Sequence, residues 1–254
     1  MEARSRPRWE PGHPAAVFSP GMRNTMTLPT HIHGYVRAEG HREEASADHR
    51  FITISREYGS GGYAIGELML QLLNRGNPPQ QWTLYDRNLV DKIIADHGLS
   101  DELRTSLEEH QLSKLDDWVA SVFEHKPPQV VLVEKTAVTV RSLAMRGRAI
   151  IMGRGGMAVT KGIKGGLHIH LVAPLEDRVS YTCRMTGEDR EAVLKRTKRI
   201  DHERREYVET YYGADLKDAT LFHAVLNTSR LGYARTARTI VRLLDDFTGH
   251  GSPM

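Results

Sequence analysis

Short apolar runs alternate with longer segments of helical apolar spacing from Phe51 to the C-terminal part of the chain. The strand-like runs lie at 51–55, 82–85, 149–152, 168–172 and 222–226. Helical spacing is found at 65–73, 89–94, 112–123, 130–145, from about 175, at 188–211 (one long helix or a helix pair) and at 233–246, with a further helix beginning at Ser100. This alternation indicates an α/β fold with a mostly parallel sheet.

The ends of the chain lack this periodicity. Residues 1–50 are dominated by Pro, His, Arg, Ala and Ser, so we expect a disordered or loosely attached tail, followed by a domain over 51–248 and a short tail over 249–254. No apolar run of about 18 residues and no signal-peptide h-region occur, which predicts neither a membrane span nor secretion. The single cysteine, Cys183, excludes an internal disulfide framework, and a cytoplasmic location is the simplest expectation.

Charge is unevenly distributed, although the net charge of the 254 residues is only +3. Residues 135–175 contain seven basic and no acidic side chains, and residues 194–205 contain six basic and two acidic ones. Residues 86–126, by contrast, contain ten acidic and five basic side chains. The basic segments therefore either pair with the acidic segment or face an anionic ligand, and charge alone favours neither alternative.

A glycine-rich loop follows the first predicted strand, in the sequence Ile52-Thr-Ile-Ser-Arg-Glu-Tyr-Gly-Ser-Gly-Gly62. Backbone N–H groups in such a loop converge on an anion, and the following helix adds the positive end of its dipole. The Walker pattern is incomplete, because Gly62 stands where its lysine is expected and Tyr63-Ala64 replace the next two residues. Taken alone, the loop is compatible with a phosphate cradle or with a plain tight turn.

Two more polar loops come directly after predicted strands. Ile150-Ile-Met-Gly-Arg-Gly-Gly156 sets Arg154 among glycines, and Tyr85-Asp-Arg87 ends the second strand. Ligands of open α/β sheets bind at the carboxyl ends of strands, and the planar guanidinium suits a phosphate. Convergence of the three loops indicates a phosphate site more specifically than any one of them. The alternative for Arg154 is an ion pair with a neighbouring strand end.

A fourth signal lies in the basic helix, as Lys198-x-x-Asp201-x-x-Arg204. A spacing of three residues places these side chains on one helical face. Further arginines that could close over phosphates with them are Arg178, Arg184 and Arg205. The alternative is a solvated helix whose ion pairs involve Glu203 and Glu206.

In order and spacing these motifs, together with Leu226-Asn-Thr-Ser-Arg-Leu-Gly232, resemble the cytidylate kinase-like family, a nucleoside monophosphate kinase branch of the P-loop NTPases. The resemblance runs from about Phe51 to Leu244. It implies a three-layer α/β/α core with a parallel five-stranded sheet of order 2-3-1-4-5 and a helical lid over about 176–212. It also implies phosphoryl transfer from ATP with Mg²⁺ to a nucleoside monophosphate, CMP or dCMP by default.

The resemblance also implies residue roles. The donor nucleotide would be bound by Arg56, Gly59, Ser60, Gly61, Gly62 and Tyr63. The acceptor would be bound by Asp86, Arg87, Lys92, Gly153 and Arg154. Catalytic roles would fall to Arg154, Arg178, Lys198, Asp201 and Arg204, and Mg²⁺ would be held by Ser60 or Asp86.

Other functions are distinguished by particular features. Gly62 leaves open a nucleotide-binding sensor or interaction module with weakened catalysis. The basic stretch 135–175 lacks interleaved aromatic residues, so we do not expect nucleic acid as the partner. His168-x-His170 and His31-x-His33 lack a carboxylate or cysteine partner and indicate ordinary strand alternation rather than a metal site.

Overall fold

The computed structural model describes residues 49–95, 107, 109–122 and 131–247. The strands are β1 (Phe51–Arg56), β2 (Thr83–Tyr85), β3 (Ala149–Met152), β4 (Gly166–Val172) and β5 (Ala224–Asn227). The helices are α2 (Gly62–Leu73), α3 (Arg87–Ala95), α5 (Glu109–Val122), α6 (Val131–Arg146), α7 (Gly156–Val159), α8 (Leu175–Thr186), α9 (Arg190–Tyr212), η2 (Ala219–Leu221), α10 (Thr228–Leu231) and α11 (Tyr233–Asp246). The helix predicted to begin at Ser100 lies outside the described residues.

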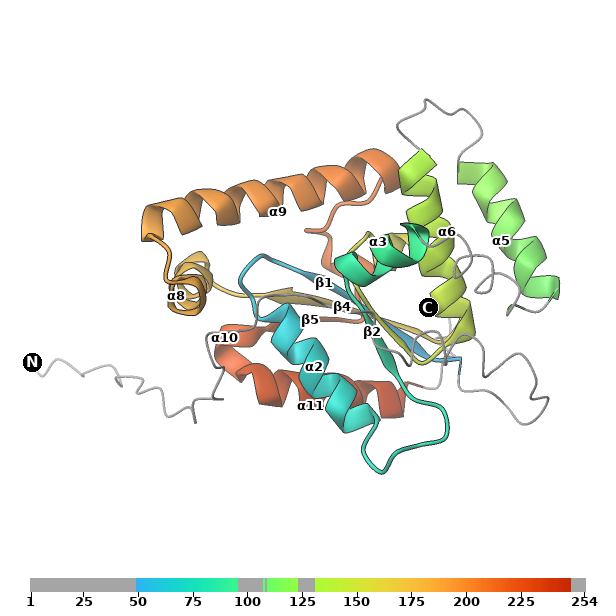
Figure 1. Ribbon diagram of the computed structural model, residues 1–254, viewed down its shortest axis with the longest axis horizontal. Coiled ribbons are helices and arrows are strands. Elements are labelled where there is room, and N and C mark those ends of the chain that lie inside the picture. The colour runs from blue at the N-terminus through green and yellow to red at the C-terminus, as the bar shows by residue number, and fades with distance from the viewer. Residues whose placement is uncertain (1–48, 96–106, 108, 123–130, 248–254) are drawn as a thin grey trace, which may run out of the picture.

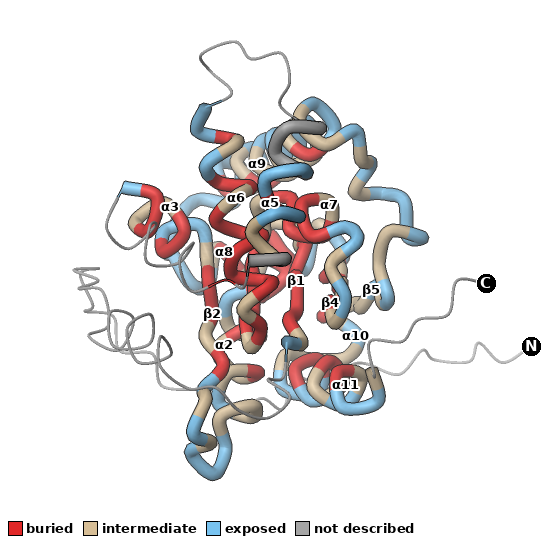
Figure 2. The backbone as a smooth tube through the Cα atoms, turned by 90° about the vertical axis from the view of Figure 1, so that its right-hand side faces the viewer, coloured by how far each residue is buried: buried red, intermediate tan, exposed pale blue. Residues whose placement is uncertain are grey.

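All five strands run parallel in one sheet of order β2-β3-β1-β4-β5, which confirms the predicted order. The central strand is β1, where Phe51 pairs with Ala149 of β3 and with Gly166 of β4. Residues 51–55 are buried, as expected for a strand covered on both faces (Figure 2). The carboxyl ends of β1 and β3 therefore lie side by side.

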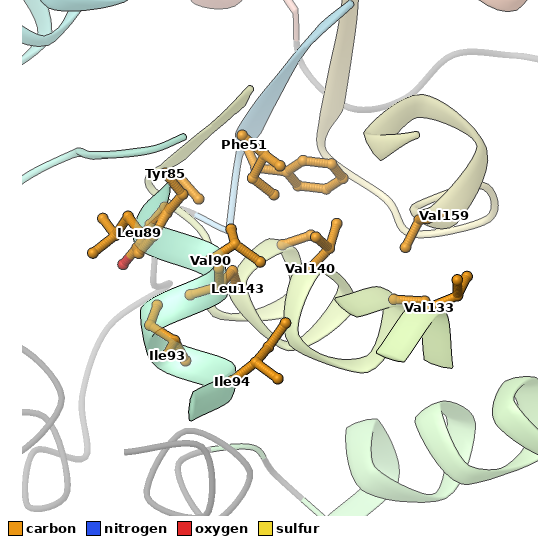
Figure 3. Close-up of a cluster of buried hydrophobic side chains, with 14 residues drawn as sticks. Phe51, Tyr85, Leu89, Val90, Ile93, Ile94, Val133, Val140, Leu143 and Val159 are labelled. Atoms are coloured by element: carbon orange, nitrogen blue, oxygen red, sulfur yellow. The ribbon is translucent and has the colours of Figure 1, made fainter. Parts of the chain in front are cut away.

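Helices cover both faces of the sheet, which gives the three-layer α/β/α architecture (Figure 1). Strand alternation sends Ile52 and Ile54 into the core beneath α2 and α11. Phe51 points to the opposite face and packs with residues of α3 and α6, including Val90 and Val140 (Figure 3). In Figure 1, α8 and α9 extend from the edge of this core, with α9 running above the sheet as drawn.

Most predicted elements are confirmed, and the differences have local causes. The charged segment 188–211 is one helix, α9, whose N-terminus is capped by Asp189 accepting from two backbone N–H groups and which ends at Gly213 with φ of 61°. The last strand begins at Ala224, two residues later than predicted. Helix α7 was not predicted, because four residues are too few to show a helical period.

The start of the described chain is attached to the domain. His49 Nδ1 lies 3.2 Å from the carbonyl oxygen of Met145, and Arg50 donates to the carbonyl of Leu244 at 2.9 Å. The remainder of the predicted N-terminal tail, and 249–254, lie outside the described residues. None of the helices in the described ranges is long and apolar enough to cross a membrane.

Candidate functional site

A cavity of about 620 Å³ opens where the carboxyl ends of β1 and β3 meet α9. Its lining residues are Ser55, Arg56, Arg87, Leu132, Met152, Gly153, Arg154, Gly155, Arg199, Ile200, Glu203, Arg204, Tyr207, Val208 and Leu216. Two of the predicted polar loops and one residue of the predicted basic face thus meet at one site. The location agrees with the rule that ligands of open α/β sheets bind beyond the carboxyl ends of the strands.

Arg56 spans the space between the start of α2 and the loop after β3. Its stem passes over Gly62, where an added Cβ would lie 3.1 Å from Cγ of Arg56. Its guanidinium lies over Gly153, where an added Cβ would collide with Nη1. Gly153 also has φ of 80°, a conformation that favours glycine. The two glycines therefore make room for the same arginine side chain.

Several cationic side chains lie close together in this cavity. Burial and, next, the positive charge of Arg204 lower the pKa of Arg56 to about 9, and the carboxylate of Asp86 opposes this shift. Burial likewise lowers the pKa of Arg204, whose Nη1 donates to the carbonyl of Arg56 at 3.0 Å. In the described part of the chain, no carboxylate forms an ion pair with Arg56 or Arg204. A bound anion would stabilise both charges.

Arg154 forms an ion pair, which was one of the two alternatives for this residue, but its partner Asp91 was not predicted. The guanidinium of Arg154 donates to Asp91 of α3, and Nε of Arg87 lies 3.7 Å from the same carboxylate. The four-residue spacing of Arg87 and Asp91 is the sequence signal that could have pointed to this carboxylate. One residue of the basic segment 135–175, Arg154, therefore pairs with the acidic segment 86–126. Arg154 also has φ of 56°, a strained conformation that is concentrated at functional sites.

Arg178 lies outside the cavity lining and binds protein groups. Its Nη1 donates to Asp201 Oδ2 at 2.6 Å and to the carbonyl of Tyr58 at 2.9 Å, while its Nε donates to the carbonyl of Ala173 at 2.9 Å. Asp201 Oδ1 in turn accepts from the Tyr58 N–H at 2.7 Å, and Glu57 Oε2 lies 3.4 Å from Arg178 Nε. We call Glu57, Arg178 and Asp201 the clamp, because they join the β1 loop to α8 and α9.

The glycines of the predicted phosphate loop have protein neighbours. An added Cβ on Gly59 would lie 2.8 Å from the carbonyl oxygen of Arg178, and one on Gly61 would collide with the ring of Tyr233. Both glycines also have positive φ, a conformation that favours glycine. Close packing and backbone conformation therefore account for both residues, as in an ordinary tight turn. Helix α2 nevertheless begins at Gly62 without a side-chain cap from any described residue, which leaves its first N–H groups without intrahelical partners.

The two predicted magnesium ligands are placed differently. Ser60 is buried, and its hydroxyl donates to the carbonyl of Glu57 at 2.8 Å. Asp86 is partly exposed, accepts from the N–H of Leu89 at 2.9 Å, and is close enough to Arg56 to affect its pKa. No group of three or more His, Cys, Asp or Glu side chains in the described ranges could hold a metal by itself. Of the two residues, Asp86 fits better a metal bound jointly with phosphates.

The remaining predicted residues are more peripheral. Lys198 and Tyr63 are exposed, Lys92 is partly exposed, and none of the three lines the cavity. Asp201 also lies outside the lining and acts in the clamp. The basic face of α9 is therefore divided, with Arg204 in the cavity and Asp201 facing the β1 loop.

Sequence reasoning also missed the apolar end of the cavity. It is formed by Leu132, Ile200, Tyr207, Val208 and Leu216. These residues come from α6, from α9 and from the segment after α9, so no local motif marks them. Beside this end, an added Cβ on Gly155 would lie 2.6 Å from Cε2 of Tyr212. The ring of Tyr212 therefore excludes any larger side chain at position 155.

Comparison with known proteins agrees with this architecture. The chain is similar to an uncharacterized protein from Eubacterium ventriosum ATCC 27560, with 17% identity, a TM-score of 0.62 and coverage of 78% of this chain and 99% of that one. It also matches a shikimate kinase from Bacteroides thetaiotaomicron with 12% identity and a TM-score of 0.42, over 78% of this chain and 97% of that one. No curated protein matches. The family model described as "Cytidylate kinase-like family" matches residues 51–230, and the chain therefore belongs to the cytidylate kinase-like family.

Proposed function

We propose that this protein transfers a phosphoryl group from ATP, with Mg²⁺, to a nucleoside monophosphate. Membership of the cytidylate kinase-like family supports a nucleotide kinase-like function. The observation that carries the proposal is the pair Arg56 and Arg204, which line one cavity with no ion-pair partner in the described ranges. Phosphoryl transfer requires two nucleotides in line and cations on the transferring group, with little covalent chemistry from the protein.

The acceptor is proposed to lie in the cavity. Its phosphate is held by Arg154 and Arg87, which the shared partner Asp91 orients. Its nucleoside packs against the apolar end, where Tyr207 supplies an aromatic ring. The volume of about 620 Å³ is within the usual range for small-molecule sites. CMP and dCMP are the first acceptors to test.

The donor is proposed to bind at the glycine-rich loop. The uncapped N-terminus of α2, from Gly62, faces the donor phosphates with its free N–H groups. Asp86 is the carboxylate that would hold Mg²⁺, and the metal, when bound, neutralises charge on the donor phosphates. The clamp residues Arg178 and Asp201 act by positioning, because they fix α8 and α9 against the loop after β1.

A second candidate is a nucleotide-binding module with weakened catalysis. The specific observation in its favour is Gly62, which leaves no lysine on the phosphate loop. The two candidates differ in turnover but share nucleotide binding. Binding of ATP without transfer to any nucleoside monophosphate would select the module.

A coupled assay with ATP, Mg²⁺ and each of the common nucleoside monophosphates tests the proposal. We expect turnover, and we expect Arg204→Ala to lower kcat/KM by about 10² to 10³-fold, the usual effect of removing one group that stabilises transition-state charge. Arg75→Ala is the matched control, because Arg75 is exposed in the turn after α2. Absence of turnover with every acceptor would contradict the kinase assignment, and an unchanged Arg204→Ala variant would contradict the assigned site.

A further inference from the structure

We propose that Arg56 does the work of the missing phosphate-loop lysine, so that the cation has moved from position 62 to position 56. In this arrangement the guanidinium contacts the phosphoryl group during its transfer. The inference deepens the proposed function and rests on it for the chemistry, while the phosphate contact itself is measurable separately.

The side chains at positions 56 and 62 would be in close contact at the start of α2. Arg56 ends β1 and Gly62 begins α2, so the two residues flank one loop. The stem of Arg56 lies against Gly62, since an added Cβ would be 3.1 Å from Cγ and 3.6 Å from both Cβ and Cδ of Arg56. Gly62 has no positive φ, so its backbone does not require glycine. A side chain at position 62 would therefore require the stem of Arg56 to shift by a few tenths of an ångström.

The Arg56 side chain reaches from the start of α2 to the loop after β3. From its position over Gly62, the side chain extends until Nη1 lies against Gly153, next to Arg154. One end of the side chain is thus beside the loop proposed for the donor, and the other end is beside the loop proposed for the acceptor. A guanidinium carries five N–H donors in a planar fork and can contact oxygens of two phosphates together, which a lysine ammonium does as a point charge.

Among the described residues, no side chain competes with a ligand for the guanidinium of Arg56. Within the described residues, the side chain of Arg56 has no hydrogen bond or ion pair. The nitrogens of Arg178, by contrast, donate to Asp201 and to the carbonyls of Tyr58 and Ala173. Its charged neighbours are Arg204, Arg154 and Arg87, against the single carboxylate of Asp86. Burial first, and then these neighbouring arginines, lower the pKa of Arg56, and a polyanion is the ligand that would offset the positive charge.

The step balances without a redox partner. An oxygen of the acceptor phosphate forms a bond to the γ-phosphorus of ATP, and the bond from that phosphorus to the bridging oxygen of ADP breaks. The bridging oxygen keeps the electron pair, and any proton on the acceptor phosphate passes to solvent. Arg56 donates hydrogen bonds to the equatorial oxygens of the transferring group and to the leaving oxygen, where charge develops.

The test is a swap of the two positions. Arg56→Gly and Gly62→Lys are each expected to lower kcat by about 100-fold or more, the first by removing the cation and the second by crowding Arg56. The double variant Arg56→Gly/Gly62→Lys is expected to regain at least about tenfold over either single variant, as coupled neighbours do. Added guanidinium ion is expected to restore part of the turnover of Arg56→Gly. Arg56→Met is the control for folding, because it removes the charge and keeps the apolar stem.

Each outcome decides the inference. If the wild type turns over and Arg56→Gly and Arg56→Met stay within twofold of it, Arg56 is not the phosphate cation. If both variants lose turnover while neither the swap nor guanidinium restores it, Arg56 is only structural, and the inference is overturned. If the wild type shows no turnover at all, the proposed function fails, and calorimetry with inorganic tripolyphosphate decides. Affinity that is lost in Arg56→Met and regained in the double variant supports the phosphate contact, whereas equal affinities overturn it.

Discussion

Two arginines beside the loop that follows β1 illustrate different uses of the same side chain. Arg178 is buried in the clamp, where its nitrogens are bound by Asp201 and by the carbonyls of Tyr58 and Ala173. Arg56 lines the cavity with other arginines and has no ion pair in the described part of the chain. A saturated arginine holds the fold together, and an unsaturated one is available to a ligand. Residue type and motif position are therefore poorer guides to function than pairing is.

Arg154 is intermediate between these two cases. It is paired with Asp91, yet its Nε is buried without a hydrogen-bond partner and its backbone is in the left-handed region. Partial pairing orients the guanidinium and leaves donors for a ligand, as expected of a binding arginine held by a carboxylate. The three arginines thus form a series from structural to ligand-facing.

The largest expected effect is on the clamp. Arg178→Ala should lower the free energy of unfolding by about 3–5 kcal/mol, because it leaves the carboxylate of Asp201 buried without its partner. Denaturant unfolding measures this loss. Arg190→Ala is the matched control, since its pair with Glu176 is exposed and should contribute about 1 kcal/mol or less. A loss for Arg178→Ala as small as the control would show that the clamp is not structural.

His168 of β4, which lies beside Thr53 of β1, resists protonation in the folded protein. His168 lies 2.8 Å from Thr53 Oγ1 and stacks near His223, and burial, with a smaller contribution from His223, lowers the pKa of His168 to about 4. As the pH falls, the unfolded chain therefore binds a proton at His168 near pH 6.5, whereas the folded chain binds it only near pH 4. The contribution of His168 to stability should be level above pH 6.5 and fall by at most about 3 kcal/mol as pH decreases to 4, and the lowered pKa values of His170 and His223 add losses of the same sign.

Unfolding by urea across this pH range measures the effect. His168→Asn should flatten the dependence, because the amide has no proton to gain. His202→Asn is the control, since His202 is exposed on α9. A profile for His168→Asn with the same slope as the wild type would contradict the assignment of the acid loss to His168.

The smallest expected effect has the opposite sign. Arg56→Met should raise the free energy of unfolding of the ligand-free protein by about 1 kcal/mol, because it removes an unpaired cation beside other arginines and keeps the apolar stem. The same variant should lose the thermal shift that millimolar tripolyphosphate gives the wild type. A decrease in stability comparable to that of Arg178→Ala would place Arg56 with the structural arginines.

Much of the fold was predictable because its signals are local. The β-branched run from Phe51, the glycine breaks after β1 and β3, and the amphipathic spacing of α11 each occupy one segment of sequence. The start of β5 was misplaced by two residues, since Phe222 and His223 have the composition of a strand but precede the pairing that begins at Ala224. Edge strands carry weaker sequence signals because only one neighbour specifies their register.

The candidate site was predictable only in part. The sequence motifs identified Arg154 and Arg204, and the structure places both in the cavity lining. The same motifs included Arg178 and Lys198, which lie outside that lining. Asp91 and the apolar end were missed, because they come from segments without a motif of their own. A helical spacing of three or four residues shows which side chains share a face, but it does not show what that face contacts.

The sequence by itself determined the alternation of strands and helices, the loops at the carboxyl ends of the strands and the concentration of basic residues in two segments, because periodicity, glycine positions and charge are properties of neighbouring residues. Only the tertiary structure decided which arginines are paired. Arg178 and Asp201 are 23 positions apart, and Arg154 and Asp91 are 63 positions apart, so their contacts depend on how the helices pack on the sheet. Since pairing determines whether a cation stabilises the fold or remains available to an anion, the uneven charge acquires a functional meaning only in three dimensions.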